Sequence, residues 1–254
     1  MILRPDEKGT EKSQFQGQIR TTRQRGDSSG TPRSLFHLTS LDEQIAGRSL
    51  LTHPFYQAWT RGELTAEALK DYAIQYYRHV EAFPTYLSAL HSHTADASTR
   101  RHILQNLIDE EAGSPNHPAL WMQFAEAAGA SEGEVRAAEP WDETRNLVET
   151  FRRLCRDGST AEGLAALYSY ESQIPAVATS KIDGLKRFYG KDSPEALQYF
   201  VVHEEADVEH SAVERRLLEQ HVSAANADAV KQASAQALDA LWEMLSGVCR
   251  RHGM

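Results

Sequence analysis

The chain contains, at residues 203–210, the stretch His203-Glu204-Glu205-Ala206-Asp207-Val208-Glu209-His210. An α-helix turns by roughly 100° per residue, so His203, Asp207 and His210 would lie within about 60° of one another on one helical face. Such a face can present two imidazoles and one carboxylate to the same metal centre. The spacing therefore predicts a helix with a metal-binding face. The alternative is a charged surface face with incidental histidines, because the same spacing is common in amphipathic helices.

The composition is that of a soluble globular protein. The 254 residues are 41% hydrophobic and 25% charged, enough for one large domain or two small ones. The net charge of −9 argues against nucleic acid as a partner, because phosphate binding needs a basic surface. No segment approaches the roughly 20 apolar residues of a membrane span, and no signal-peptide core is present, so we expect a cytoplasmic protein with no membrane partner. The two cysteines, Cys155 and Cys249, form no CxxC motif and fit a reducing compartment.

The first 34 residues differ in composition from the rest. Residues 1–34 contain seven Lys or Arg, four Asp or Glu and one aromatic residue, Phe15. Such a segment buries too little apolar surface to offset its ordering entropy, so we predict a disordered basic leader. It is either an interaction arm or an over-extended translation start. We expect residues 35–254, which carry 20 basic and 32 acidic side chains, to form one domain.

From Leu35 onward the pattern is helical almost throughout, rich in Ala, Leu, Glu, Gln and Arg. Helix boundaries are expected at Thr65 and about His91, around Gly113–Asn116, at Ser159 or Thr160, at Pro175, at Ser193-Pro194, and for a last helix over about 225–250. No internal repeat is present. We therefore predict a single all-α bundle of about seven helices.

Two further places can supply metal ligands. Glu110 and His117 flank the break at Gly113-Ser-Pro-Asn, and Glu171 is a lone carboxylate in an apolar and aromatic stretch, where an unpaired charge is costly. With the first stretch they make a set of three carboxylates and three imidazoles, which suits two iron or manganese ions better than structural zinc. The set is Glu110, His117, Glu171, His203, Asp207 and His210.

Other polar residues near these positions are weaker candidates for metal ligands. Glu111 neighbours Glu110, and we expect only one of the two to point inward. Glu214 lies one turn beyond His210 and is expected to support the ligands without binding metal itself. His79, beside Tyr76 and Tyr77, is interpreted as a core histidine with satisfied hydrogen bonds, with a cavity-lining role as the alternative.

Several blocks together resemble the CADD family, named for a chlamydial protein associating with death domains and linked in bacteria to folate metabolism. The resemblance covers about residues 35–222. It rests on Glu81-Ala-Phe-Pro-Thr-Tyr-Leu-Ser-Ala-Leu-His91, Asp109-Glu-Glu-Ala-Gly-Ser-Pro-Asn-His117, Ala166-Leu-Tyr-Ser-Tyr-Glu-Ser-Gln-Ile-Pro175 and residues 203–210. It implies a haem-oxygenase-like bundle of seven helices, like the PqqC and TenA proteins, which binds two metal ions, Fe/Fe or Fe/Mn, through the six residues above.

The resemblance also implies an activity. Similar proteins make para-aminobenzoate with O₂ and an external reductant, using one of their own tyrosines as the carbon source and a lysine as the amino donor. The matching positions are Tyr56, in His53-Pro-Phe-Tyr56, and Lys181, in Thr179-Ser-Lys181. The residues alone do not separate Tyr56 from the other tyrosines, and without the resemblance Lys181 is interpreted as an exposed helix lysine.

Other functions are weighed against this one. A dimetal oxidase acting on a free small molecule would use the same ligands, and a death-domain-binding protein would need none of them. TenA-like hydrolysis is disfavoured because neither cysteine lies in the ligand-bearing blocks, and PqqC-like metal-free oxidation would leave six coordinating groups without a purpose. The reductant and the oligomeric state are left open, with a homodimer as one candidate.

Overall fold

The computed structural model describes residues 33–254, with side chains from Leu38 onward. The predicted disordered leader therefore lies outside the described residues, except for Arg33 and Ser34, which begin the first helix. All regular structure in the described part is helical. It consists of α1 (Arg33–Gly47), the 3₁₀ helix η1 (Leu50–Thr52), α2 (Pro54–Arg61), α3 (Ala66–His93), α4 (Ala97–Glu111), α5 (His117–Ala127), α6 (Glu132–Ala137), α7 (Asp142–Asp157), α8 (Thr160–Glu171), α9 (Ile174–Phe188), α10 (Pro194–His221) and α11 (Ala227–His252).

Local capping sequences set most of the helix ends. The side chains of Thr65, Ser159 and Ser193 accept hydrogen bonds from backbone N–H groups in the first turns of α3, α8 and α10. Ser159 forms a reciprocal capping box with Glu162. Pro175 lies in the first turn of α9, directly after α8 ends, so the predicted break is confirmed.

The all-α prediction is confirmed, but the described residues form eleven α-helices instead of about seven. The short helices α2 and α6 account for part of the difference, since neither has the length for a clear apolar period. In addition, α8 ends at Glu171 and α9 begins at Ile174, so Ser172 and Gln173 divide this stretch into two helices.

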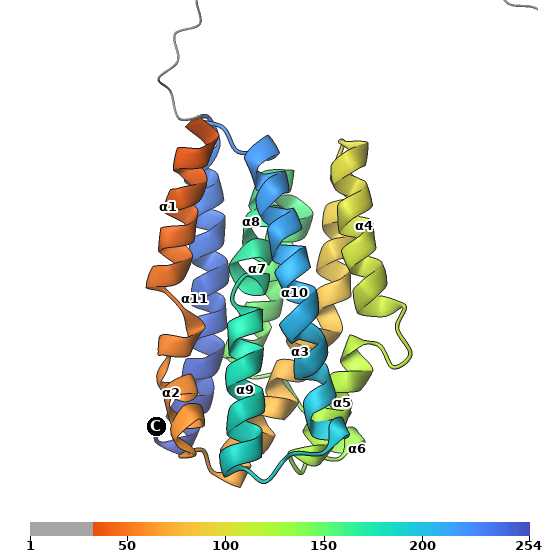
Figure 1. Ribbon diagram of the computed structural model, residues 1–254, viewed down its shortest axis with the longest axis vertical. Coiled ribbons are helices and arrows are strands. Elements are labelled where there is room, and N and C mark those ends of the chain that lie inside the picture. Colours follow the sequence, from red (N-terminus) through yellow and green to blue (C-terminus); the bar gives the residue numbers. More distant parts are fainter. Residues whose placement is uncertain (1–32) are drawn as a thin grey trace, which may run out of the picture. The chain divides into compact units, whose positions relative to one another are not determined.

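The helices of this folded part run largely along one direction, with α10 in the middle of the view between α9 on one side and α4 and α5 on the other (Figure 1). In three dimensions α10 packs against α9, α5 and α8, and α3 packs against α7, α4 and α5. Residues on α4, α5, α8 and α10 therefore face a common interior. None of the described helices is long and apolar enough to cross a membrane.

Candidate dinuclear metal centre

The structure brings the six predicted ligands together as two buried groups of three. Glu110, His117 and His203 form the first group, and the second consists of Glu171, Asp207 and His210. Within each group the possible ligand atoms all lie within 4.8 Å of one another, close enough to bind one metal ion. Because α10 contributes to both groups, its i, i+4, i+7 face joins two sites instead of forming one.

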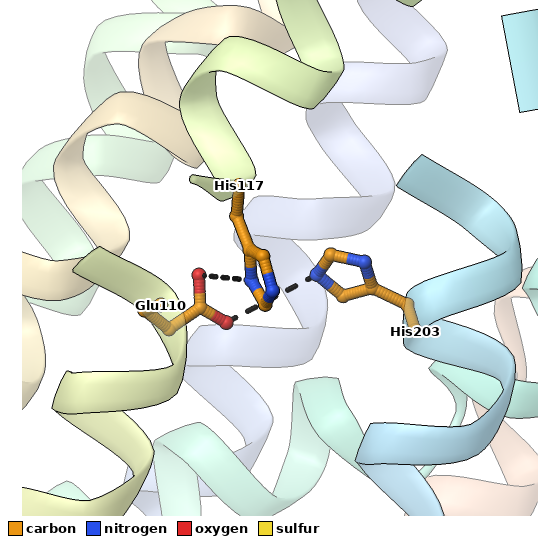
Figure 2. A group of neighbouring side chains, drawn as sticks. All are labelled: Glu110, His117 and His203. Carbon is orange, nitrogen blue, oxygen red and sulfur yellow. Dashed lines mark ion pairs between the residues drawn. The ribbon is translucent and has the colours of Figure 1, made fainter. Parts of the chain in front are cut away.

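The first group forms where α4 and α5 meet α10. Glu110 lies in the last turn of α4 and His117 is the first residue of α5, so the short connection between these helices turns both side chains toward His203 (Figure 2). Oε2 of Glu110 is 2.7 Å from Nδ1 of His117, and Oε1 is 4.0 Å from Nε2 of His203. The ring centres of His117 and His203 are 4.4 Å apart.

The second group joins the end of α8 to the middle of α10. Glu171 is the last residue of α8, and its two carboxylate oxygens accept hydrogen bonds from the side-chain amide of Asn106 at 3.0 and 3.3 Å. Nδ1 of His210 lies 3.4 Å from Oδ1 of Asp207. Asn106 thus fixes the orientation of Glu171 from α4, a role that supporting residues have in metal sites.

In two of the histidines, one ring nitrogen lies within hydrogen-bond distance of a residue that belongs to neither ligand group. Nδ1 of His203 is 2.6 Å from the carbonyl oxygen of Tyr199, and Nε2 of His210 is 3.2 Å from Oδ2 of Asp109. When these nitrogens donate, Nε2 of His203 and Nδ1 of His210 keep a lone pair for a metal ion. The face of Tyr199 also stacks on His203, at 4.0 Å between ring centres.

The protonation of the second group reflects crowded buried acids. Burial and the charge of Asp207 raise the pKa of Glu171 to about 8. Burial opposes the charged form of His210, but hydrogen bonding to Asp207 and the charge of Glu171 outweigh it and raise its pKa to about 9. Burial and the neighbouring Glu171 raise the pKa of Glu214 well above its usual range. A metal ion would replace the protons that this arrangement holds.

The donor atoms fit metal binding. Oδ2 of Asp207 is buried with no hydrogen-bond partner among the described residues, an arrangement that is costly unless a cation or water satisfies it. Mixed carboxylate and imidazole ligands are typical of iron and manganese sites. Glu111, by contrast, is exposed, as expected when its neighbour Glu110 points inward.

Tyr56 and Lys181 meet in an aromatic cluster near the first group. Lys181, on α9, is 3% exposed, and burial lowers the pKa of its amine to about 7. Its Nζ donates a 2.6 Å hydrogen bond to the hydroxyl of Tyr72 and lies 5.6 Å from the ring centre of Tyr56 and 5.4 Å from that of Tyr76. Tyr56 is 2% exposed, and burial raises the pKa of its phenol.

Several residues differ from the sequence interpretation. Lys181 is buried, so its interpretation as an exposed helix lysine is wrong. His79 is a core histidine, yet neither of its ring nitrogens has a hydrogen-bond partner among the described residues. The sequence analysis missed Asn106 and the pairing of Tyr72 with Lys181. Asn106 lies one helical turn before Glu110, which is a usable signal, whereas nothing in the sequence pairs Tyr72 with Lys181.

Solved structures of known proteins share this fold. A TenA homologue from Pseudomonas syringae pv. tomato superposes with a TM-score of 0.73 at 17% identity, covering 91% of this chain and 98% of that one. A CADD-like protein of unknown function from Nostoc punctiforme superposes with a TM-score of 0.71 at 17% identity, covering 86% and 98%. A domain from Shewanella denitrificans described as having a heme oxygenase-like fold superposes with a TM-score of 0.67 at 16% identity, covering 87% and 92%. The fold is therefore haem-oxygenase-like, as the resemblance to the CADD family implied.

Sequence comparisons define the family within that fold. Residues 70–242 match the model of the iron-containing redox enzymes, and the chain belongs to this family. It is also 49% identical, over 206 residues, to a protein of Chlamydia pneumoniae named 4-aminobenzoate synthase, a match that covers 81% of this chain and 92% of that protein. Lys181 and the six ligand residues lie inside the family match, whereas Tyr56 precedes it.

Proposed function

We propose that this protein makes 4-aminobenzoate (para-aminobenzoate) for folate synthesis from its own Tyr56, with Lys181 as the amino donor. The reaction would use O₂, an external reductant and two metal ions, Fe/Fe or Fe/Mn, held by the six residues of the two groups. In this proposal the ring and Cβ of Tyr56 become the ring and carboxyl carbon of the product. The name of the chlamydial relative supports the product, and the family supports iron.

The observation that carries the proposal is the environment of the Lys181 amine. A lysine is nucleophilic only when deprotonated, and a pKa of about 7 gives a large neutral fraction at physiological pH. Among the described residues the amine has no carboxylate partner, and it lies among the rings of Tyr56, Tyr72 and Trp121. A structural lysine would ordinarily extend its charged end to water, so this burial indicates a chemical role.

The residues around Tyr56 can position it and exclude water. Tyr56 packs edge-on against Phe55, with ring centres 5.3 Å apart. Burial raises the pKa of its phenol, and the nearby side chain of Tyr72 partly offsets that rise. Tyr72 therefore lies beside Tyr56 and also accepts a hydrogen bond from the amine of Lys181. When bound, a reduced pair of iron or manganese ions supplies the means of activating O₂ beside these aromatic residues.

The test uses protein grown with ring- and Cβ-labelled tyrosine, loaded with Fe(II) and Mn(II), then exposed to reductant and O₂. We expect labelled 4-aminobenzoate together with damage at Tyr56 in the peptide mass spectrum. Tyr56→Phe should lose the product and keep its metal content, while Tyr77→Phe, at a tyrosine whose hydroxyl contacts Glu81 instead, should retain the product. Wild-type product levels from Tyr56→Phe would overturn the proposal, and Tyr72→Phe tests whether the neighbouring tyrosine is consumed instead.

A further inference from the structure

A cavity of about 340 Å³ lies beside the second group of ligands, between α3, α4, α8 and α10. Its volume falls in the range of small-molecule sites. Aliphatic side chains form one part of its wall, and polar or charged side chains, including Asn106, His210 and Glu214, form the rest. The aliphatic residues are Leu87, Ile103, Leu164, Leu167, Val213 and Leu217.

The buried polar residues of this cavity present unpaired acceptors. Neither carboxyl oxygen of Glu214 has a hydrogen-bond partner among the described residues, although Glu214 is only 4% exposed. Oδ1 of Asn106 is also buried and unpartnered, while its amide nitrogen is used by Glu171. Leaving a buried acceptor unpaired costs roughly 1–3 kcal/mol. A carboxyl group keeps one accepting oxygen whether or not it is protonated, so this oxygen of Glu214 and Oδ1 of Asn106 favour an occupant that donates hydrogen bonds.

The cavity and the aromatic cluster lie at opposite ends of the ligand groups. Three positions along α10 show this order. Phe200 contacts the Lys181 amine, with Nζ 5.0 Å from its ring centre, and the ligands His203, Asp207 and His210 follow. Glu214, one turn further on, lines the cavity. Fourteen residues of helix separate Phe200 from Glu214, a rise of about 20 Å. A molecule in the cavity would touch His210 without entering the cluster around Tyr56.

We propose that this cavity is a second binding site, for a small organic molecule with an apolar body and at least two hydrogen-bond donors. Hydroxyl or ammonium groups of the ligand pair with Glu214 and Asn106, and its body packs against the aliphatic part of the wall. Anions are disfavoured because the buried oxygens are acceptors and the exposed rim carries Asp109 and Glu209 as well as Arg216. The site gives an external molecule an approach to the second group, whether or not Tyr56 is consumed.

Matched aromatic probes test the donor requirement on the full-length, metal-loaded protein under nitrogen. Resorcinol has two hydroxyl donors, 1,3-dimethoxybenzene has the same ring with acceptors only, and benzoate is an anion. By titration calorimetry we expect resorcinol to bind once per chain and the other two at least tenfold more weakly, since one or two lost hydrogen bonds correspond to about that factor. Equal binding of resorcinol and 1,3-dimethoxybenzene would overturn the proposal. So would a failure of resorcinol to bind, because water would then be the occupant of the cavity.

Two variants locate the binding. Val213→Phe, at a half-buried wall position, should fill the cavity and weaken resorcinol binding at least tenfold. The matched change Val148→Phe enters a separate hollow between α3 and α7 and should leave binding unchanged. Glu214→Leu removes both carboxyl oxygens and should weaken resorcinol binding several-fold. Metal content is measured for every variant, because Glu214 adjoins Glu171. Unaltered binding to Val213→Phe would place the probe elsewhere and refute the site.

Discussion

Lys181 on α9 donates a 2.6 Å hydrogen bond from Nζ to the hydroxyl of Tyr72 on α3, although 109 positions separate the two residues. Both side chains are buried, and in the part of the chain that the structure describes no carboxylate pairs with the amine. The contact satisfies one N–H of a neutral amine and leaves its lone pair free. Long-range packing has therefore made an ordinary helix lysine into a candidate nucleophile.

Replacing Lys181 with Met should change how stability depends on pH. The folded-state pKa of about 7 lies below the ordinary value of 10.5, so the unfolded chain binds more protons between these values. The free energy of unfolding of the wild type should therefore rise from pH 7 to pH 10, by at most about 3–5 kcal/mol relative to Lys181→Met. It should not rise further above pH 10.5, the ordinary lysine pKa that applies in the unfolded chain. Urea unfolding at both pH values measures this. Lys186→Met, exposed on the same helix, should follow the wild type. A constant difference between wild type and Lys181→Met would contradict the buried-amine assignment.

The two groups should lose metal independently. His203→Ala removes one of three ligands from the first group, and His210→Ala does the same in the second. Each variant should bind about one metal ion per chain where the wild type binds two, as measured by elemental mass spectrometry after desalting. His91→Ala, in neither group, serves as the control. Two tightly held ions in His203→Ala would mean that this residue is not a ligand.

Asn106→Leu should weaken the second group selectively. It keeps the approximate volume but removes the amide donor that holds both oxygens of Glu171. Losing such a supporting hydrogen bond typically costs about 10–100-fold in metal affinity. Competition with a chelator should show this loss for one ion only, and Asn146→Leu, on the exposed face of α7, should show none. Equal weakening of both ions would indicate general unfolding of the interior instead.

Gly184→Ala should disturb the contact between α9 and α2. A Cβ at Gly184 would overlap the indole ring of Trp59, whose Nε1 donates to the carbonyl of Lys181 at 3.3 Å. Overpacking of this kind costs about 1–3 kcal/mol. Gly133→Ala in α6 faces open space and should be neutral or slightly stabilising. Thermal unfolding of both variants checks this, and similar melting temperatures would show that Trp59 can move aside.

Much of the fold was predictable because its signals are local. Thr65, Ser159 and Ser193 cap helices within three residues of themselves, and Pro175 breaks the chain where it stands. The number of helices was underestimated because short helices such as α6 are held mainly by packing, which leaves little periodic pattern to recognise.

The sequence by itself determined the all-α class, the main helix ends and the residue types that can bind metal, since these follow from local periodicity and side-chain chemistry. Only the tertiary structure decided that His203 belongs with Glu110 while His210 belongs with Glu171, and that Lys181 is buried beside Tyr72. It also revealed the cavity at Glu214. These properties depend on contacts between helices far apart in the chain, and the desolvation that shifts the Lys181 pKa arises only when those helices pack.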